Sequence, residues 1–213
     1  MPTVATKSTA VPSFNLSSPA GTDIWRKPPS HNVFTAPTKP DPLPKIPLQK
    51  FQRAKLTFAL PTANTLRQYD QAGLLLHLTK PGLEPGKDKW LKTGIEFYYG
   101  KPYLSTVGCD AWADWSVVPL TPFAGNSRPT ATLEARREKD QLGKSLWVYQ
   151  IISDEDGKEI ERRPLREVNW IFADEDGWEI GIGGYVCRPT KEGGAGLLEA
   201  EFEKGVEIEV LDV

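Results

Sequence analysis

From residue 51 onward, short apolar runs alternate with turn-forming residues, and this pattern predicts β-strands. The runs are rich in Val, Ile, Leu and aromatic residues, and clusters of Gly, Pro, Asn and Asp separate them. Such spacing is typical of an all-β sandwich. A helix over residues 134–142 is the only competing assignment, and its apolar face is too thin to support it. The predicted strands cover residues 51–60, 69–78, 91–99, 103–109, 130–137, 146–153, 168–173, 180–186 and 198–210.

One of these segments, residues 91–99, alternates well, and residues 69–78 form a buried-type run. In both, alternate positions separate a core face from a second face, because successive side chains of a strand point to opposite sides. The predicted core positions are Leu91, Thr93, Ile95 and Phe97 in one segment and Ala72, Leu74, Leu76 and Leu78 in the other. The opposite faces carry Trp90, Lys92, Gly94, Glu96 and Tyr98, and Tyr69, Gln71, Gly73, Leu75 and His77.

The second face mixes aromatic rings with charged and amide side chains. An ordinary solvated face, with Lys and Glu paired across strands, is one interpretation. A ligand groove is the other, since aromatic rings flanked by hydrogen-bonding groups suit the C–H faces and hydroxyls of a sugar. The sequence leaves both open.

The first 50 residues differ from the rest in composition. They hold ten of the 19 prolines, which disfavour helix and predict extended, irregular chain. Phe14, Trp25 and Phe34 are unusual for a linker, so we expect residues 13–50 to form an arm that packs on a single domain spanning 13–213. Residues 1–12 are expected to be a frayed, disordered tail. Whether the arm covers the groove is left open.

Composition and charge exclude several classes. The 26 basic and 28 acidic residues nearly balance, which argues against a nucleic-acid partner. The 39% hydrophobic content is too high for a disordered chain. No signal-peptide core or membrane-length apolar run is present, so we expect no membrane association, a cytoplasmic location, and free thiols at Cys109 and Cys187.

Two near-copies of one acidic segment lie at residues 153–160 and 173–180, each containing Asp-Glu-Asp-Gly. Asp-Gly between apolar runs is a hairpin signal, which is the favoured interpretation. The Asp-x-Asp spacing also suits calcium, but the further ligands of an EF-hand loop are missing. A third unusual segment, Asp110–Trp115, places Asp114 and Trp115 either at the rim of the groove or as plugs of the sandwich edge.

Several motifs together resemble a known family. They are Asp23-Ile-Trp-Arg-Lys-Pro-Pro29, Tyr69-Asp-Gln-Ala-Gly-Leu74, Trp90-Leu-Lys-Thr-Gly-Ile-Glu96, Leu104-Ser-Thr-Val107 and Asp114-Trp-Ser116. The combination resembles the "regulation of enolase" family of the concanavalin A-like lectin/glucanase superfamily, and the N-terminal motif points to its fungal branch. The resemblance implies a jelly-roll sandwich of two antiparallel sheets, one of them concave. It implies no established activity.

Common catalytic templates are absent from the sequence. It contains no Gly-x-Ser-x-Gly elbow, His-Glu-x-x-His or Cys-x-x-Cys, and two histidines cannot form a three-His metal site. No metal or cofactor is therefore expected. Cys109 with His77 as base is a conceivable nucleophile, but a buried structural cysteine is the commoner fate.

Three functions remain. The favoured one is a regulatory or binding domain whose groove takes a carbohydrate-like or other small organic ligand. The second is a metal-independent lyase, isomerase, cyclase or glycosidase with His77, Lys92, Glu96 and Tyr98 as acid–base groups, Asp70 or Asp114 being candidate partner carboxylates. The third is a protein-interaction module that contacts a metabolic enzyme. Ligand identity and oligomeric state are left open. The expected ligand-binding residues are Tyr69, Gln71, His77, Trp90, Lys92, Glu96, Tyr98, Asp114 and Trp115.

Overall fold

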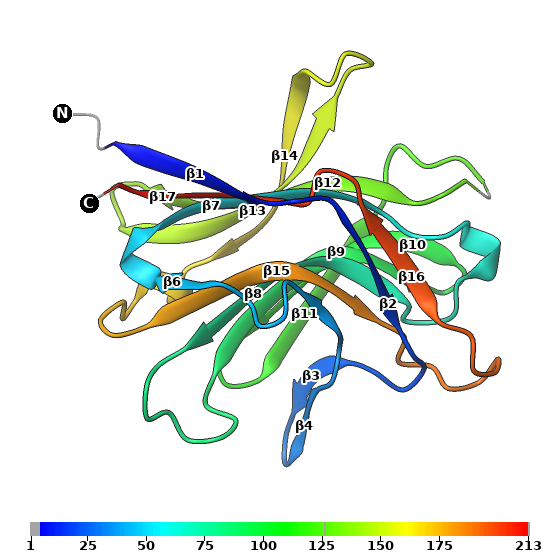
Figure 1. Ribbon diagram of the computed structural model, residues 1–213, viewed down its shortest axis with the longest axis horizontal. Helices are drawn as coiled ribbons and strands as arrows, with labels where there is room; N and C mark the ends of the chain where they lie inside the picture. The colour runs from blue at the N-terminus through cyan, green and yellow to red at the C-terminus, as the bar shows by residue number, and fades with distance from the viewer. Residues whose placement is uncertain (1–4, 126, 213) are drawn as a thin grey trace.

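Two antiparallel β-sheets pack face to face and form a sandwich (Figure 1). The computed structural model describes residues 5–125 and 127–212. Within these residues the chain forms seventeen strands and three short 3-10 helices. The all-β class expected from the strand pattern is therefore confirmed. No helix in the described part of the chain is long and apolar enough to cross a bilayer.

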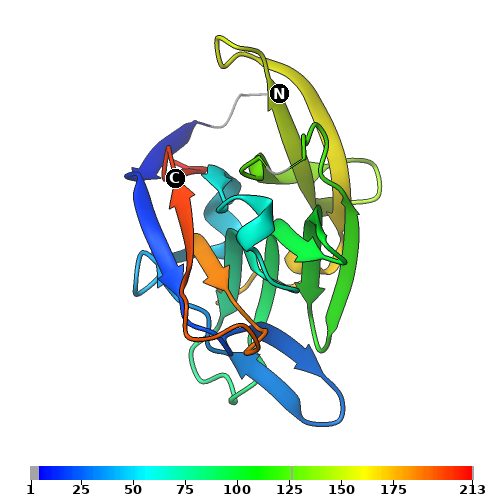
Figure 2. The ribbon, with the colours of Figure 1, turned by 90° about the vertical axis from the view of Figure 1, so that its right-hand side faces the viewer.

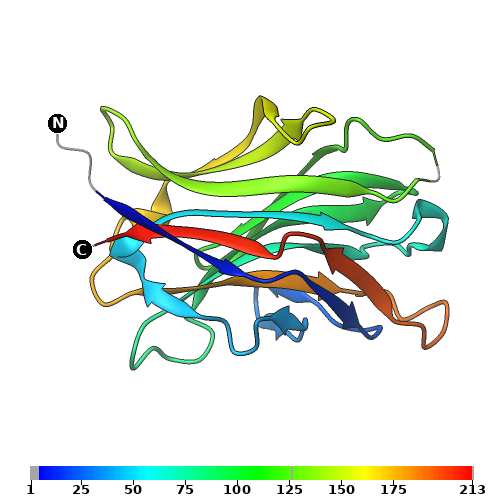
Figure 3. The same cartoon turned by 45° about the horizontal axis from the view of Figure 1, so that its top comes forward.

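The first sheet, called sheet I, holds the first and the last strand of the described residues. Its central path runs in the order β1 (Thr6–Val11), β17 (Val206–Leu211), β7 (Phe51–Ala59), β12 (Thr130–Lys139), β13 (Lys144–Ser153) and β14 (Glu159–Val168). Two more strands extend it, β16 (Leu198–Phe202) and β2 (Phe14–Ser18). Figure 3 shows β1 in dark blue beside β17 in red.

The second sheet, called sheet II, carries the strands whose alternation was clearest in the sequence. Its order is β11 (Ala113–Pro119), β10 (Lys101–Cys109), β9 (Lys89–Tyr98), β8 (Gln71–Thr79), β15 (Glu179–Cys187) and β5 (Thr38–Lys39), with β6 (Lys45–Pro47) also on β15. One face of sheet II packs on sheet I. The other, here called the outer face, points away from it.

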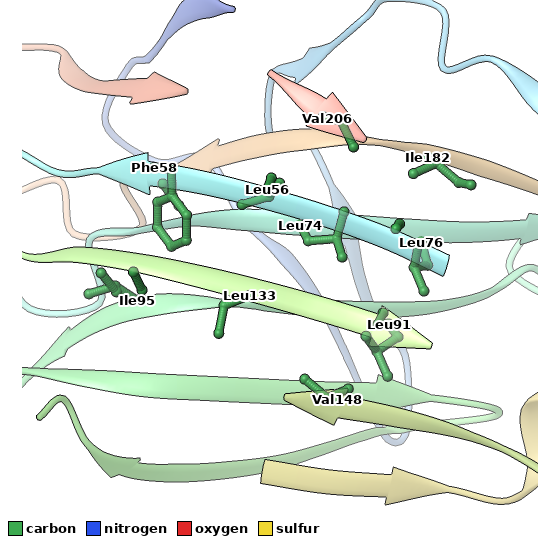
Figure 4. Packing of buried hydrophobic residues seen from close by; sticks show 14 of the residues in the cluster. Leu56, Phe58, Leu74, Leu76, Leu91, Ile95, Leu133, Val148, Ile182 and Val206 are labelled. Atoms are coloured by element: carbon green, nitrogen blue, oxygen red, sulfur yellow. The ribbon is translucent and has the colours of Figure 1, made fainter. Parts of the chain in front are cut away.

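The main hydrophobic core lies between the two sheets (Figure 4). Leucine and isoleucine side chains of sheet II meet apolar side chains of sheet I, and each buried leucine contributes about 1.5–3 kcal/mol. The predicted core positions of β8 and β9 are all buried here, so the strand alternation assigned the core face correctly. Residues that meet across this core include Leu74, Leu76, Leu91, Ile95 and Ile182 from sheet II, and Leu56, Phe58, Leu133, Val148 and Val206 from sheet I.

The N-terminal segment is more regular than its prolines suggested. After β2 it forms a hairpin of β3 (Ile24–Lys27) and β4 (His31–Phe34), and β5 and β6 then pair with β15. The hairpin lies on the outer side of sheet II, at the lower end of the sandwich in Figures 1 and 2. Residues 1–4 lie outside the described residues. The expected frayed tail is wrong for Thr6–Val11, because these residues pair along their whole length with β17.

Other local differences have simple causes. The predicted strand at residues 168–173 is instead the end of β14 followed by a 3-10 helix, η3 (Trp170–Phe172). The predicted strand at 198–210 is two strands, separated at Gly205, whose φ of 66° turns the chain. Strand β14 was missed, because its mostly charged and half-exposed residues show no alternation. The remaining 3-10 helices are η1 (Leu48–Lys50) and η2 (Ala63–Thr65).

Both Asp-Glu-Asp-Gly segments form turns, as their sequence predicts. The first connects β13 to β14, where Asp154 Oδ1 accepts hydrogen bonds from the backbone N–H of Asp156 and of Lys158. The second precedes β15, where Asp174 Oδ1 accepts from the Asp176 N–H. The glycines of the two turns have φ of 80° and 70°.

Candidate functional site

The outer face of sheet II carries a second apolar cluster, and the N-terminal hairpin covers it. Ile24 of β3 packs there with Leu75, Trp90 and Tyr185, and both cysteines belong to the same cluster. Trp90 is only 1% exposed. The parity argument placed Trp90 on the outer face correctly, but its expected position in the groove lining is wrong because the hairpin buries it.

Glycines of β15 allow the rest of the arm to lie directly on the sheet. A Cβ added to Gly183 would stand 2.4 Å from Leu43 Cδ2 and 2.5 Å from the Lys39 carbonyl oxygen. A side chain there would push the arm away. The arm therefore covers the outer face at β15.

The hairpin is fixed to sheet II by a charged clamp. Arg26 Nη2 lies 2.9 Å from Asp88 Oδ1, and Asp88 Oδ2 lies 2.9 Å from His77 Nε2. The hydrogen bond to His77 is the largest cause lowering the pKa of Asp88, and the Arg26 charge lowers it further against the effect of burial. The Phe34 ring lies tilted against the imidazole of His77, with centroids 4.7 Å apart and planes 30° from parallel. His77 is thus a structural residue of the clamp, not the groove residue that we expected.

A cavity of about 270 Å³ lies on the outer face. Its walls combine the N-terminal arm with four strands of sheet II, β8, β9, β10 and β11. Its lining residues are Asp23, Trp25, Tyr69, Gln71, Lys92, Glu96, Val107, Trp115 and Pro189.

Lys92 is the cation of this cavity. Its side chain is 2% exposed, and Nζ donates a 2.8 Å hydrogen bond to Gln71 Oε1. The same Nζ lies 3.4 Å from Asp23 Oδ1. The ring centroids of Trp25 and Tyr185 stand 5.9 and 6.0 Å from it, within the range of cation–π attraction. The ammonium is therefore held between one carboxylate and two aromatic rings.

Glu96 is the second acidic group of the cavity. The Trp115 indole N–H lies 3.1 Å from Glu96 Oε2 and 3.1 Å from Ser105 Oγ, so carboxylate and hydroxyl together orient the indole ring. Burial is the largest influence on Glu96 and raises its pKa above the usual value. The charge of Lys92 and the hydrogen bonds oppose this shift, while the nearby Asp23 carboxylate adds to it.

Two glycines leave the outer face of the sheet without side chains between Lys92 and Glu96. In the register of β8 and β9, Gly73 is paired with Gly94, between the pairs Gln71–Glu96 and Leu75–Lys92. A Cβ on Gly73 would lie 2.1 Å from the Thr93 carbonyl oxygen, and one on Gly94 would lie 2.0 Å from that of Ala72. The close backbone approach therefore requires glycine at both positions.

Five of the nine predicted ligand-binding residues line the cavity and four do not. Besides His77 and Trp90, Tyr98 and Asp114 lie outside it. Asp114 is 82% exposed and sits 3.5 Å from Arg166 Nη1. The residues that the structure brings together are Tyr69, Gln71, Lys92, Glu96 and Trp115.

Tyr98 lies next to the cavity rather than in it. Its ring centroid is 5.1 Å from that of Trp115 and 5.7 Å from that of Tyr69. A hydrogen bond with Tyr99 raises the pKa of Tyr98 to about 12. Its phenol therefore stays protonated at ordinary pH, which does not suit the base role considered above.

The sequence did not single out Asp23 and Trp25 as site residues. Both lie in the motif Asp23–Pro29, which was interpreted as part of the packing arm. The first four positions of that motif each make a defined contact: Asp23 faces Lys92, Ile24 packs in the apolar cluster, Trp25 forms a wall of the cavity, and Arg26 closes the clamp. The sequence signal for these residues was the alternation at the start of β3: Asp23 and Trp25 flank the apolar Ile24, so they share the face opposite to it.

The remaining acid–base candidates have structural roles. Asp70 accepts two hydrogen bonds from Arg188, at 3.0 and 2.7 Å, and both side chains are buried, so Asp70 is not a free partner carboxylate. Cys109 is a buried free thiol, and burial raises its pKa to about 11. The same cause raises the pKa of Cys187 to about 12. Neither thiol is a ready nucleophile.

No group of three or more His, Cys, Asp or Glu side chains within residues 5–125 and 127–212 is arranged to hold a metal ion.

The two packed antiparallel sheets define a concanavalin A-like jelly roll. Solved structures with this architecture align over nearly the whole chain. One is a functionally unknown protein from Saccharomyces cerevisiae, with a TM-score of 0.59, 18% identity and coverage of 94% of this chain and 95% of that one. Another is basic winged bean lectin with Tn-antigen, with a TM-score of 0.52, 13% identity and coverage of 98% and 100%. At these identities the likeness concerns the fold.

Sequence comparison identifies the family. The chain belongs to the family described as "Protein of unknown function (DUF1349)", whose model matches residues 3–204. It is also 44% identical over 181 residues to the uncharacterized protein AN7484 of Emericella nidulans, covering 85% of this chain and 80% of that protein. A fungal relative agrees with the branch that the N-terminal motif indicated.

Proposed function

We propose that the cavity on sheet II binds a carbohydrate. The observation that carries this proposal is the combination of two indole walls, Trp25 and Trp115, with the polar side chains of Lys92, Gln71 and Glu96 between them. The C–H faces of a sugar ring can pack on indole, while its hydroxyls exchange hydrogen bonds with ammonium, amide and carboxylate groups. Such a mixture of apolar walls and a few polar groups is typical of small-molecule sites.

The charges of the cavity favour an uncharged ligand. Lys92 is paired with Asp23 at 3.4 Å, and the pKa of Glu96 is raised, which reduces its tendency to carry charge. An anionic ligand would lie close to the carboxyl groups of Asp23 and Glu96, which would repel it where they are ionised. A cationic ligand would be repelled by the Lys92 ammonium and would have to displace it from Asp23. A neutral polyhydroxy compound avoids both penalties.

The polar groups are held in place before any ligand arrives. Gln71 fixes the ammonium of Lys92, and Glu96 with Ser105 fixes the indole of Trp115. Because these side chains are already ordered, binding loses little of their conformational entropy. This supports a binding role that needs no rearrangement of the sheet.

The test is titration of the protein with glucose, galactose, mannose, xylose and their β-linked oligomers of two to four units, followed by tryptophan fluorescence and calorimetry. Trp25→Ala and Lys92→Met should each weaken binding about tenfold or more. Trp147→Ala is the matched control, because Trp147 stacks on Tyr149 on the face of sheet I that points away from the core. It should leave binding unchanged. If the wild type binds none of these sugars at about 10 mM, or if Trp25→Ala binds them normally, the proposal is wrong.

A second candidate, acid–base catalysis on the same ligand, is favoured by one observation. Asp23 and Glu96 share the cavity but differ in environment, since Asp23 faces Lys92 whereas burial raises the pKa of Glu96. A carboxyl pair whose environments differ in this way can divide the roles of base and acid. Mass spectrometry of the sugar panel after incubation would detect products, and Glu96→Gln should then abolish turnover while retaining binding.

We further propose a cytoplasmic location for this activity. The two cysteines are free thiols and are buried, which is in keeping with a reducing compartment. Imaging of the tagged full-length chain would test this directly.

A further inference from the structure

A row of tyrosine rings continues the cavity wall toward the tip of the β9–β10 hairpin. Tyr98 touches both cavity residues Tyr69 and Trp115, and the ring centroid of Tyr99 lies 4.3 Å from that of Tyr98. We call Tyr69, Tyr98 and Tyr99 the tyrosine platform. It joins the cavity without a break, because Tyr69 belongs to both.

The platform exposes aromatic surface that the fold could have buried or replaced. Tyr99 is 77% exposed and Tyr69 is 40% exposed. Tyr98 is half-buried between them. Contiguous exposed aromatic surface beside a cavity is characteristic of a binding surface rather than of an ordinary solvated face.

The backbone at the platform is strained. Among the described residues, Tyr69 with φ of 68° and Tyr99 with φ of 46° are the non-glycine residues that have positive φ. For a bulky residue this conformation costs about 1–2 kcal/mol. Both instances fall on tyrosines of one surface patch, and strain of this kind concentrates at functional sites.

Tyr99 is an unexpected residue for its turn. Tyr98 pairs with Lys101, so Tyr99 and Gly100 form a two-residue connection in which both φ values are positive. Turns of this kind strongly prefer Asn or Asp followed by Gly. The chain uses the preferred glycine at the second position but a tyrosine at the first, so folding of the hairpin does not explain the residue.

The size of the cavity indicates how the tyrosine platform could contribute to ligand binding. At about 270 Å³ the cavity is slightly smaller than most ligand sites, which run from about 300 to 1,000 Å³. It suits one ring-sized unit. A longer ligand must extend beyond the cavity. Because Tyr69 and Trp115 line the cavity and both contact Tyr98, a ligand that extends past them meets Tyr98 and Tyr99.

We propose that the tyrosine platform is a second subsite, and that the ligand is a carbohydrate chain of at least two units. The terminal unit occupies the cavity, and the next unit packs on Tyr98 and Tyr99. This inference rests on the proposed function of the cavity, which it extends from a single sugar to an oligosaccharide.

The test compares monosaccharides with their β-linked oligomers of two to four units on the wild type and on Tyr99→Asn. The wild type should bind the best oligomer about fivefold or more tightly than its monosaccharide, the gain expected from one further stacked ring. Tyr99→Asn should lose this gain, bind the monosaccharide within about twofold of the wild type, and melt at the same or a higher temperature, because asparagine suits the turn.

Leu142→Asn is the matched control, since Leu142 is an exposed apolar residue in the β12–β13 turn. It should change neither affinity. Tyr99→Gly serves as a second variant, because glycine accepts positive φ without strain.

The outcomes separate the two proposals. If monosaccharides bind but oligomers bind no more tightly, or if Tyr99→Asn keeps the gain, the platform is not a subsite and the cavity proposal stands. If the tyrosine platform instead binds a protein partner, the affinity should be the same for the monosaccharide and for its oligomers. If no sugar binds the wild type, the cavity proposal fails and the inference fails with it.

Discussion

The guanidinium of Arg26 lies 2.9 Å from the carboxylate of Asp88, and this ion pair fixes the N-terminal hairpin to the loop between β8 and β9. Arg26 also donates a 2.8 Å hydrogen bond to the Asp88 carbonyl oxygen and a 3.1 Å hydrogen bond to Asn32 Oδ1. Because Trp25 precedes Arg26 in β3, the clamp determines where one wall of the cavity stands.

Asp88→Asn should therefore weaken both the fold and the site. Loss of the charged partner of Arg26 and His77 is expected to cost about 1–3 kcal/mol in the free energy of unfolding. Sugar binding should fall as the Trp25 wall loosens. Urea unfolding and the titration described above measure the two effects. Unchanged stability would show that the clamp does not hold the hairpin.

The pKa of Asp88 also predicts how stability changes with pH. Its folded-state pKa is lowered below the usual 3.8, so the ionised carboxylate stabilises the fold. This contribution is fully present above about pH 4 and is lost as the pH falls through the lowered value. Urea unfolding between pH 2.5 and 5, approximate limits chosen to bracket that range, should show a steeper acid loss for the wild type than for Asp88→Asn.

The contribution of Glu96 to the free energy of unfolding should change with pH in the direction opposite to that of Asp88. The folded-state pKa of Glu96 is raised above the usual 4.5, so its contribution to stability is present below that value and is lost as the pH rises through the raised value. Glu96→Gln, which cannot ionise, should gain stability relative to the wild type between about pH 4 and pH 7. A stability difference that does not change over this interval would mean that burial is not the dominant influence on Glu96.

Gly94→Ala should disrupt the sheet beneath the cavity. Its methyl group would meet the Ala72 carbonyl oxygen at 2.0 Å, and backbone cannot yield as a flexible side chain would. We expect a loss of about 1–3 kcal/mol or more, measured by chemical unfolding. Gly108→Ala in β10 is the matched control, because its nearest contact would be the Trp170 ring at 3.6 Å. If both substitutions lower the free energy of unfolding equally, the close backbone approach at Gly94 does not require glycine.

Asp70→Asn should destabilise the protein more than most surface substitutions. It leaves the buried Arg188 guanidinium without its carboxylate, and breaking a buried pair costs about 3–5 kcal/mol. Thermal unfolding measures the loss. The double variant Asp70→Leu with Arg188→Leu removes both charges and should recover part of it. If the double variant is no more stable than Asp70→Asn, the unpaired charge is not the cause.

Strands β8, β9, β10 and β15 of sheet II were predictable because each has one face in the core, whereas β5, β6 and β11 were not predicted as strands. Leu91 and Ile95 alternate with Lys92 and Glu96, and this period of two assigned both the strand and its faces. Strand β14 gave no such signal, since the core buries few of its residues. The N-terminal strand β1 shows the same limit: it is exposed on nearly every residue and depends on pairing with β17 rather than on burial.

Only those residues of the site that lie on the predicted strands could be assigned from the sequence, because alternation along a strand shows which side chains share a face. Parity placed Gln71, Lys92 and Glu96 on one face, but it could not show that a distant hairpin would bury Trp90 and engage His77. The same long-range contacts bring Asp23 and Trp25 to the cavity across about 70 residues of chain, as in the Lys92–Asp23 pair with a separation of 69. No local pattern encodes such a contact.

The strand pairing of the N-terminal segment ties the cavity to sheet I as well as to sheet II. β1 pairs with β17 and β2 with β16, and the Thr22 hydroxyl accepts a hydrogen bond from the Arg188 N–H at the end of β15. Asp23 and Trp25 follow these contacts directly along the chain, so the cavity wall that they form lies between an anchor on sheet I and the Arg26 clamp on sheet II. A substitution that weakens the pairing of β2 can therefore disturb the cavity without altering any residue that lines it.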